Sequence, residues 1–264
     1  MSDAQVLNRE GDQKMYIGTV TFRAVITSNG LKFPSCEFNP NQASVEKVVI
    51  ESQSGYEILS TVHLAGVTTE RVGRAIANKV LTAVLDRIAF RYSLAIEDSQ
   101  IVSELVRFCE STPGARVQPH SGELAIIGQQ VGLVYGIPAA DLKHGTGTDH
   151  SVWRTIFSLY RLAVQSRSPG EKFMHLYSLL LRFFEDEQVR VDDFIRSQDS
   201  AVPQSPDPRP GRSNRETVYT RLRNEFAHRR SDVNMQDTKA EMEQHVGGLI
   251  RLVKQAIALQ DTTR

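Results

Sequence analysis

The stretch SVWRTIFSLYRLAVQSRSPGEKFMHLYSLLLRFF, residues 151–184, decides the fold class of the carboxy-terminal half of the chain. Large apolar side chains recur in it every three or four residues, which is the spacing of an amphipathic helix. Ser168 and Pro169 interrupt the pattern, and a serine cap followed by a first-turn proline is typical of a helix start. The stretch therefore predicts two consecutive helices. Their apolar stripes consist of Trp153, Phe157, Tyr160 and Val164 in the first, and of Phe173, Leu176, Tyr177, Leu180 and Phe184 in the second.

Helical patterns continue from there to the carboxy terminus. Further helices are expected over residues 189–196, 214–228 and 237–259. Residues 199–213 hold four prolines and are expected to form an extended connector, because proline lacks a backbone donor and disfavours helix. We therefore predict that residues 148–264 form an all-α helical bundle.

The amino-terminal half has strand patterns and one long helical pattern. Its expected elements are a strand over residues 15–27, a hairpin with arms at 45–52 and 56–64, helices from 69 and over 98–109, and one or two strands within 124–137. The helix from residue 69 is expected to pack across the sheet through one apolar stripe. These patterns predict an α+β domain over residues 1–147, a short antiparallel sheet with a long packing helix, followed by a flexible linker at 138–149. The expected stripe consists of Val72, Ile76, Val80, Val84 and Ile88.

The composition is that of an ordinary globular protein. The 264 residues include 31 basic and 31 acidic side chains, so net charge gives no argument for nucleic acid or a membrane, and such binding needs a local patch. The two cysteines form no disulfide framework, and the polar amino terminus lacks the apolar core of a secretion signal. No apolar run approaches the roughly 20 residues needed to span a bilayer. These features predict a cytoplasmic protein without a membrane association.

The segment ETVYTRLRNEFAHRR, residues 216–230, combines a packing stripe with polar residues of catalytic type. Arg223, Asn224 and His228 fall off the stripe, and the last two lie one helical turn apart. Residues 206–230 contain seven arginines against three acidic residues, a local excess of four positive charges. Arginine suits phosphate oxygens and histidine moves protons near neutral pH, a combination suited to RNA backbone cleavage. The alternative is a solvated helix end whose charges complement the helix dipole.

Arg223-Asn224-Glu225-Phe226-Ala227-His228 resembles the signature of the HEPN superfamily, an arginine with a polar neighbour and a histidine after four to six positions. The resemblance covers about residues 150–260. It implies a HEPN-like helical bundle that pairs as a homodimer through the helical domain, and a metal-independent endoribonuclease or an RNA-binding protein. No cofactor and no metal ion are implied.

The resemblance also implies roles for individual residues. His228 accepts the proton of a ribose 2′-hydroxyl, Arg223 stabilises the charge of the phosphorane-like transition state, and Asn224 orients the histidine or the phosphate. The nearby arginines are candidates for RNA and phosphate binding. These candidates are Arg215, Arg221, Arg229 and Arg230.

The whole chain is also similar to the MauJ family, which is encoded in methylamine-utilisation gene clusters. The similarity lies mainly in YRLAVQSRSPGEKFMHLYSLLLRFF and in the segment at residues 216–230. It implies the alternative function, a non-catalytic accessory or scaffold protein of methylamine utilisation.

Other polar groups have simpler interpretations. His144 and His150 lack further ligands at metal spacing, so no metal site is predicted. Cys109 lies in an apolar run and is expected to be a buried hydrophobe. The acidic residues at 185–187 and 192–193 are expected to form the solvated end of a helix rather than a cation site.

Overall fold

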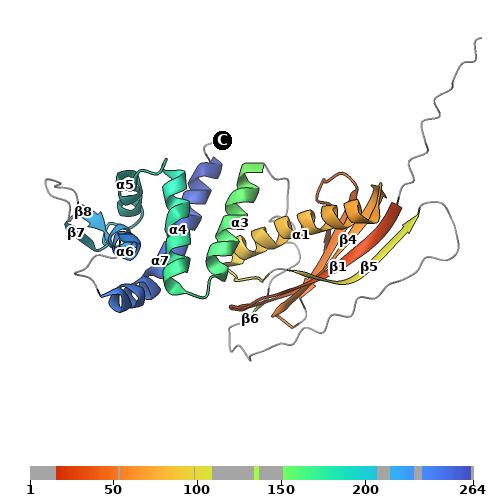
Figure 1. Cartoon of the computed structure of the whole chain (residues 1–264), viewed down its shortest axis with the longest axis horizontal. Helices are drawn as coiled ribbons and strands as arrows, with labels where there is room; N and C mark the ends of the chain where they lie inside the picture. Colours follow the sequence, from red (N-terminus) through yellow and green to blue (C-terminus); the bar gives the residue numbers. More distant parts are fainter. Residues whose placement is uncertain are drawn as a thin grey trace, which may run out of the picture. The chain divides into compact units, whose positions relative to one another are not determined.

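The computed structural model divides into two compact units (Figure 1). The first unit contains the described parts of Met1–Val25, Leu31–Thr82 and Asp98–Thr148, and the second those of Ile26–Gly30, Ala83–Glu97 and Asp149–Arg264. The sequence division at residue 147 placed residues 26–30 and 83–97 in the amino-terminal domain, whereas they pack within the second unit. The structure describes residues 16–52, 54–97, 99–108, 134–136, 151–206, 215–228 and 234–262.

The first unit is built on a sheet that, within the described residues, has six strands in the order β5-β1-β4-β3-β2-β6. The pairs β1–β4, β1–β5, β2–β3 and β3–β4 are antiparallel. Alternate side chains are buried, as in β4, because one face of an antiparallel sheet commonly packs against the core. The strands are β1 (Tyr16–Val25), β2 (Gly30–Phe38), β3 (Val45–Ser52), β4 (Glu57–Val67), β5 (Gln100–Phe108) and β6 (Val134–Gly136).

The long helix α1 (Glu70–Tyr92) confirms the expected helix, and its first half packs against the sheet (Figure 1). Gly73 permits a close approach, because a Cβ atom there would lie 3.1 Å from Leu64 Cδ1. The expected stripe is wrong at its first residue, since Val72 is 40% exposed. Val80, Val84 and Ile88 are buried as predicted, and the first turns of the helix bury Gly73 and Ala77 in place of Val72.

Two further differences concern strands. The helix predicted over residues 98–109 is wrong, because Gln100–Phe108 forms β5 and pairs with β1 along its length. Sheet pairing overrides the local helical preference of a short segment. Strand β2 was not expected at all. Of the strands predicted within residues 124–137 only β6 is described, and the linker at 138–149 lies outside the described residues.

The second unit contains the predicted helices, so the chain has an α+β part followed by a helical part. Helix α4 lies at the centre and packs against α3, α5, α6 and α7, and Figure 1 shows α3, α4 and α7 side by side. Ser168 caps α4 as predicted, accepting a hydrogen bond from the backbone N–H of Glu171. The helices are α3 (Ser151–Gln165), α4 (Pro169–Phe183), α5 (Gln188–Gln198), α6 (Val218–His228) and α7 (Met235–Thr262).

The described part of the proline-rich segment, residues 199–206, contains a paired strand and a buried side chain. Strand β7 (Gln204–Pro206) pairs with β8 (Arg215–Thr217), and Val202 beside it is 4% exposed. The prediction of an unpacked connector over residues 199–213 is therefore wrong for 199–206, while 207–213 lie outside the described residues. Because Thr217 pairs within β8 and its hydroxyl then accepts from the backbone N–H of Thr220, helix α6 begins later than predicted.

Within the described part of the chain, no helix combines the length and the apolar character that crossing a bilayer requires.

Candidate functional site

Arg223 and Asn224 are brought together on α6 by a direct hydrogen bond. Arg223 Nη1 donates to Asn224 Oδ1 at 3.0 Å, and Gln188 Nε2 from α5 donates to the same oxygen at 2.9 Å. Asn224 Nδ2 donates to Glu216 Oε1 of β8 at 2.9 Å. Asn224 is only 5% exposed, so it is a buried connection between three elements and cannot contact a bound phosphate directly.

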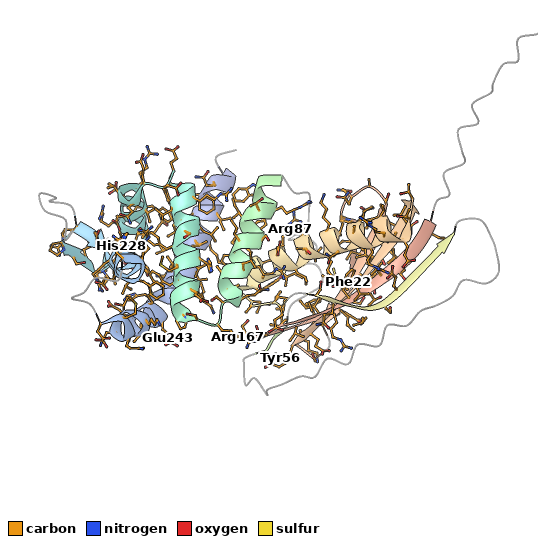
Figure 2. The ribbon with its side chains drawn as sticks, in the orientation of Figure 1. Phe22, Tyr56, Arg87, Arg167, His228 and Glu243 are labelled. Atoms are coloured by element: carbon orange, nitrogen blue, oxygen red, sulfur yellow. The ribbon has the colours of Figure 1, made fainter. Side chains whose placement is uncertain are left out.

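His228 is separate from this group. It is the last residue of α6, its side chain is exposed, and Figure 2 marks its position on the helix. Among the described residues it forms no hydrogen bond or ion pair. Five positions on an α-helix correspond to about 7.5 Å along the axis and about 140° around it, so α6 alone does not align His228 with Arg223. The exposed residue that shares a side of α6 with Arg223 is Ala227, one turn later.

A second polar group is centred on Asp192 of α5. Asp192 Oδ1 accepts three hydrogen bonds, from Thr217 N at 3.1 Å, Thr217 Oγ1 at 2.6 Å and Thr220 Oγ1 at 2.6 Å. The Tyr177 hydroxyl and the Thr220 hydroxyl share a further hydrogen bond of 2.7 Å. Asp192 is 5% exposed, so the expectation that it belongs to a solvated helix end is wrong. Its neighbour Asp193 is exposed, as predicted.

The ionisation of Tyr177 shows how the surrounding charges are placed. Burial raises the pKa of its hydroxyl far above the usual value, and the carboxylates of Asp192 and Glu216 raise this pKa further. The hydrogen bond with Thr220 and the charge of Arg223 act in the opposite direction and lower it. The charges of Arg223, Asp192 and Glu216 therefore all reach the Tyr177 hydroxyl, although within the described residues Arg223 forms no ion pair with either carboxylate.

The other predicted arginines differ in how far their charges are already paired. Arg221 donates to Glu225 Oε1 at 2.9 Å and to Glu241, and both carboxylates hold its pKa above the usual value against the lowering effect of burial. Its guanidinium therefore already forms ion pairs with two carboxylates of the second unit. Arg215 is exposed and donates to the carbonyl oxygen of Gln204 at 2.9 Å. Arg229 and Arg230 lie outside the described residues.

Sequence patterns missed three members of this arrangement, namely Gln188, Asp192 and Glu216. Gln188 and Glu216 are 36 and 8 residues from Asn224, so no helical spacing connects them. Among the described residues no cluster of three or more His, Cys, Asp or Glu side chains is placed to bind a metal ion. Cys109, His144 and His150 lie outside the described residues.

Comparison with known proteins finds no matching family model, no matching curated protein and no matching solved structure.

Proposed function

We propose that this chain binds RNA and cleaves it without a metal ion, as a homodimer of HEPN-like helical domains, through Arg223 and His228. One observation carries the proposal. Arg223 is half-buried, is held by the buried amide of Asn224 and forms no ion pair within the described residues, while an exposed His228 ends the same helix. A positioned guanidinium with free donors is suited to a phosphate. The metal independence comes from the family resemblance.

In this function His228 removes the proton from a ribose 2′-hydroxyl, whose oxygen then attacks the adjacent phosphorus and expels the 5′-oxygen. Arg223 stabilises the added negative charge on the phosphate. Asn224 acts on Arg223 rather than on the phosphate, because it is buried and accepts a hydrogen bond from Nη1. The second subunit supplies the acid for the leaving oxygen, because one imidazole does not act as base and acid in the same step.

The first prediction tests this chemistry directly. Purified protein is incubated with mixed-sequence single-stranded RNA in EDTA, and the rate of cleavage is measured. Arg223→Ala and His228→Ala are each expected to lower the rate roughly a hundredfold, the usual scale for losing a general base or a charge-stabilising donor. Matched controls are Arg167→Ala and His175→Ala, which remove an exposed arginine and an exposed histidine of the same unit. Equal rates in the test variants and the controls contradict the proposal.

A second prediction uses a pairing that α6 already contains. Arg221 and Glu225 form an ion pair four residues apart at 2.9 Å. Ala227→Glu places a carboxylate four residues after Arg223 in the same arrangement, so it is expected to neutralise this guanidinium. RNA affinity, measured with a 2′-O-methyl oligonucleotide that cannot be cleaved, should fall roughly tenfold. Ala227→Gln has the same shape without the charge and should bind almost normally. Equal affinities for the two variants contradict a phosphate contact by Arg223.

The alternative is the non-catalytic accessory or scaffold function implied by the MauJ resemblance. One observation favours it, since the charges of Arg223, Asp192 and Glu216 all act on the buried Tyr177 hydroxyl, with Arg223 opposing the two carboxylates, as a structural counter-charge would. In that case the wild-type protein cuts no RNA, and Arg223→Ala lowers the stability of the second unit instead of an activity.

A further inference from the structure

We propose that Glu216 is a positioning residue for Arg223 and acts through the side-chain amide of Asn224. The catalytic consequence rests on the proposed function, whereas the positioning itself is measurable without RNA. Glu216 is 3% exposed and touches neither His228 nor Arg223 by any hydrogen bond that the described residues show. The hydrogen bond that it accepts from Asn224 Nδ2 connects it directly to the side chain that holds Arg223.

The orientation of the Asn224 amide follows from its partners. An ionised carboxylate only accepts hydrogen bonds and a guanidinium only donates them. The NH₂ group of Asn224 must therefore face Glu216, and its carbonyl oxygen must face Arg223, as the two distances of 2.9 and 3.0 Å show. Turning the amide over would set oxygen against carboxylate and NH₂ against guanidinium. Glu216 thus selects the one orientation in which Asn224 accepts from Arg223.

The elements around Asn224 hold its side chain in this orientation. Glu216 lies in the middle of β8, where Ser205 of β7 is its partner. Gln188, at the start of α5, donates to the same Asn224 oxygen as Arg223 does. One end of the guanidinium is thereby attached to a side chain that two other elements hold in place. The remaining N–H groups of Arg223 keep a constant direction, and among the described residues no ion pair cancels their charge.

The closing experiment replaces Glu216 by its neutral isostere. In Glu216→Gln the new amide both donates and accepts, so residue 216 no longer selects between the two orientations of Asn224, and only the donors Arg223 and Gln188 still favour the native one. We expect kcat for RNA cleavage in EDTA to fall roughly tenfold, with KM changed much less, because alignment is lost in the transition state. In the Arg223→Ala background the same substitution should have no further effect, because its action passes through Arg223.

Glu225→Gln is the matched control. Glu225 is also a buried carboxylate with an arginine partner, but that partner is Arg221 and Asn224 is not involved. We expect this control to cleave at the wild-type rate below its melting temperature. A Glu216→Gln rate equal to that of the wild type, or a full tenfold loss that persists in the Arg223→Ala background, overturns the positioning role.

An NMR measurement separates this inference from the proposed function. In the wild type the Nη1 bond to Asn224 should slow rotation of the Arg223 guanidinium and resolve its Nη proton signals, which should average together in Glu216→Gln. If the wild-type protein cuts no RNA, the proposed function fails, and these signals still decide the positioning. Identical Arg223 signals in the two proteins overturn it.

Discussion

Replacing Asp192 with alanine is expected to lower the unfolding free energy of the second unit by about 3–4 kcal/mol. The substitution removes the acceptor of three buried hydrogen bonds, those from Thr217 N, Thr217 Oγ1 and Thr220 Oγ1. A buried donor left without a partner costs about 1–3 kcal/mol, and partial relaxation reduces the sum of three such losses. The Thr217 bonds also join α5 to β8 just before α6 begins, so their loss loosens the contact between α5 and β8.

Urea denaturation, followed by tryptophan fluorescence, measures this loss of stability in the second unit. Trp153 is the single tryptophan of the chain and is buried in the core of the second unit, so its emission reports on that unit. Asp192→Asn keeps one acceptor oxygen and is expected to cost about half as much. Asp193→Ala is the matched control, because this neighbouring carboxylate is exposed and pairs with Arg196. The control should change stability by less than about 1 kcal/mol. Equal losses for Asp192→Ala and Asp193→Ala would falsify the expected difference.

The contrast between these two neighbours shows which part of the fold was open to prediction. On α5 the apolar residues Val191 and Ile195 mark the buried side, and successive residues turn by about 100°. Asp192 therefore falls at the edge of the buried side and Asp193 opposite it. Treating both as one acidic cluster lost this information, whereas a position-by-position helical projection would have separated them.

The helices of the second unit were predictable because each buries a stripe with a 3.6-residue period, which needs no knowledge of its neighbours. Strand β5 was not predictable in this way, because the sequence QIVSELVRF is compatible with either a helix or a strand. Its pairing with β1 decides that it forms a strand. Strand β8 and the late start of α6 likewise depend on pairing with β7. For these elements, contacts between segments distant in sequence decide whether the chain forms a helix or a strand.

The candidate site likewise has a part that follows from local sequence and a part that depends on contacts between distant segments. Arg223, Asn224 and His228 lie within six residues, so a short motif was enough to select them. Sequence spacing did not show that Asn224 is buried, because its partners Gln188 and Glu216 come from other elements. It also did not show that Arg221 is committed to Glu241 of α7, which removes it from the group of arginines with unpaired charge.

A second large effect is expected at Arg161 on α3, which pairs with Asp86 of α1 within the second unit. Arg161 Nε lies 2.5 Å from Asp86 Oδ1, and the two side chains are 7% and 2% exposed. Arg161 also donates to the carbonyl oxygen of Ile96 at 3.4 Å. Removing one partner of a buried ion pair leaves a charge away from water and typically costs about 3–5 kcal/mol. Arg161→Met should lower the unfolding free energy by this amount in the Trp153 fluorescence assay.

Two further variants identify the buried charge as the cause. Arg167 forms an ion pair with Glu97 at 3.5 Å and is 93% exposed, so Arg167→Met should change stability by less than about 1 kcal/mol. The double variant Asp86→Leu/Arg161→Met removes both buried charges and should recover a large part of the loss, because apolar replacements of a whole buried pair are often neutral. A double variant less stable than Arg161→Met alone would mean that lost packing at Arg161, rather than the charge left on Asp86, causes the loss.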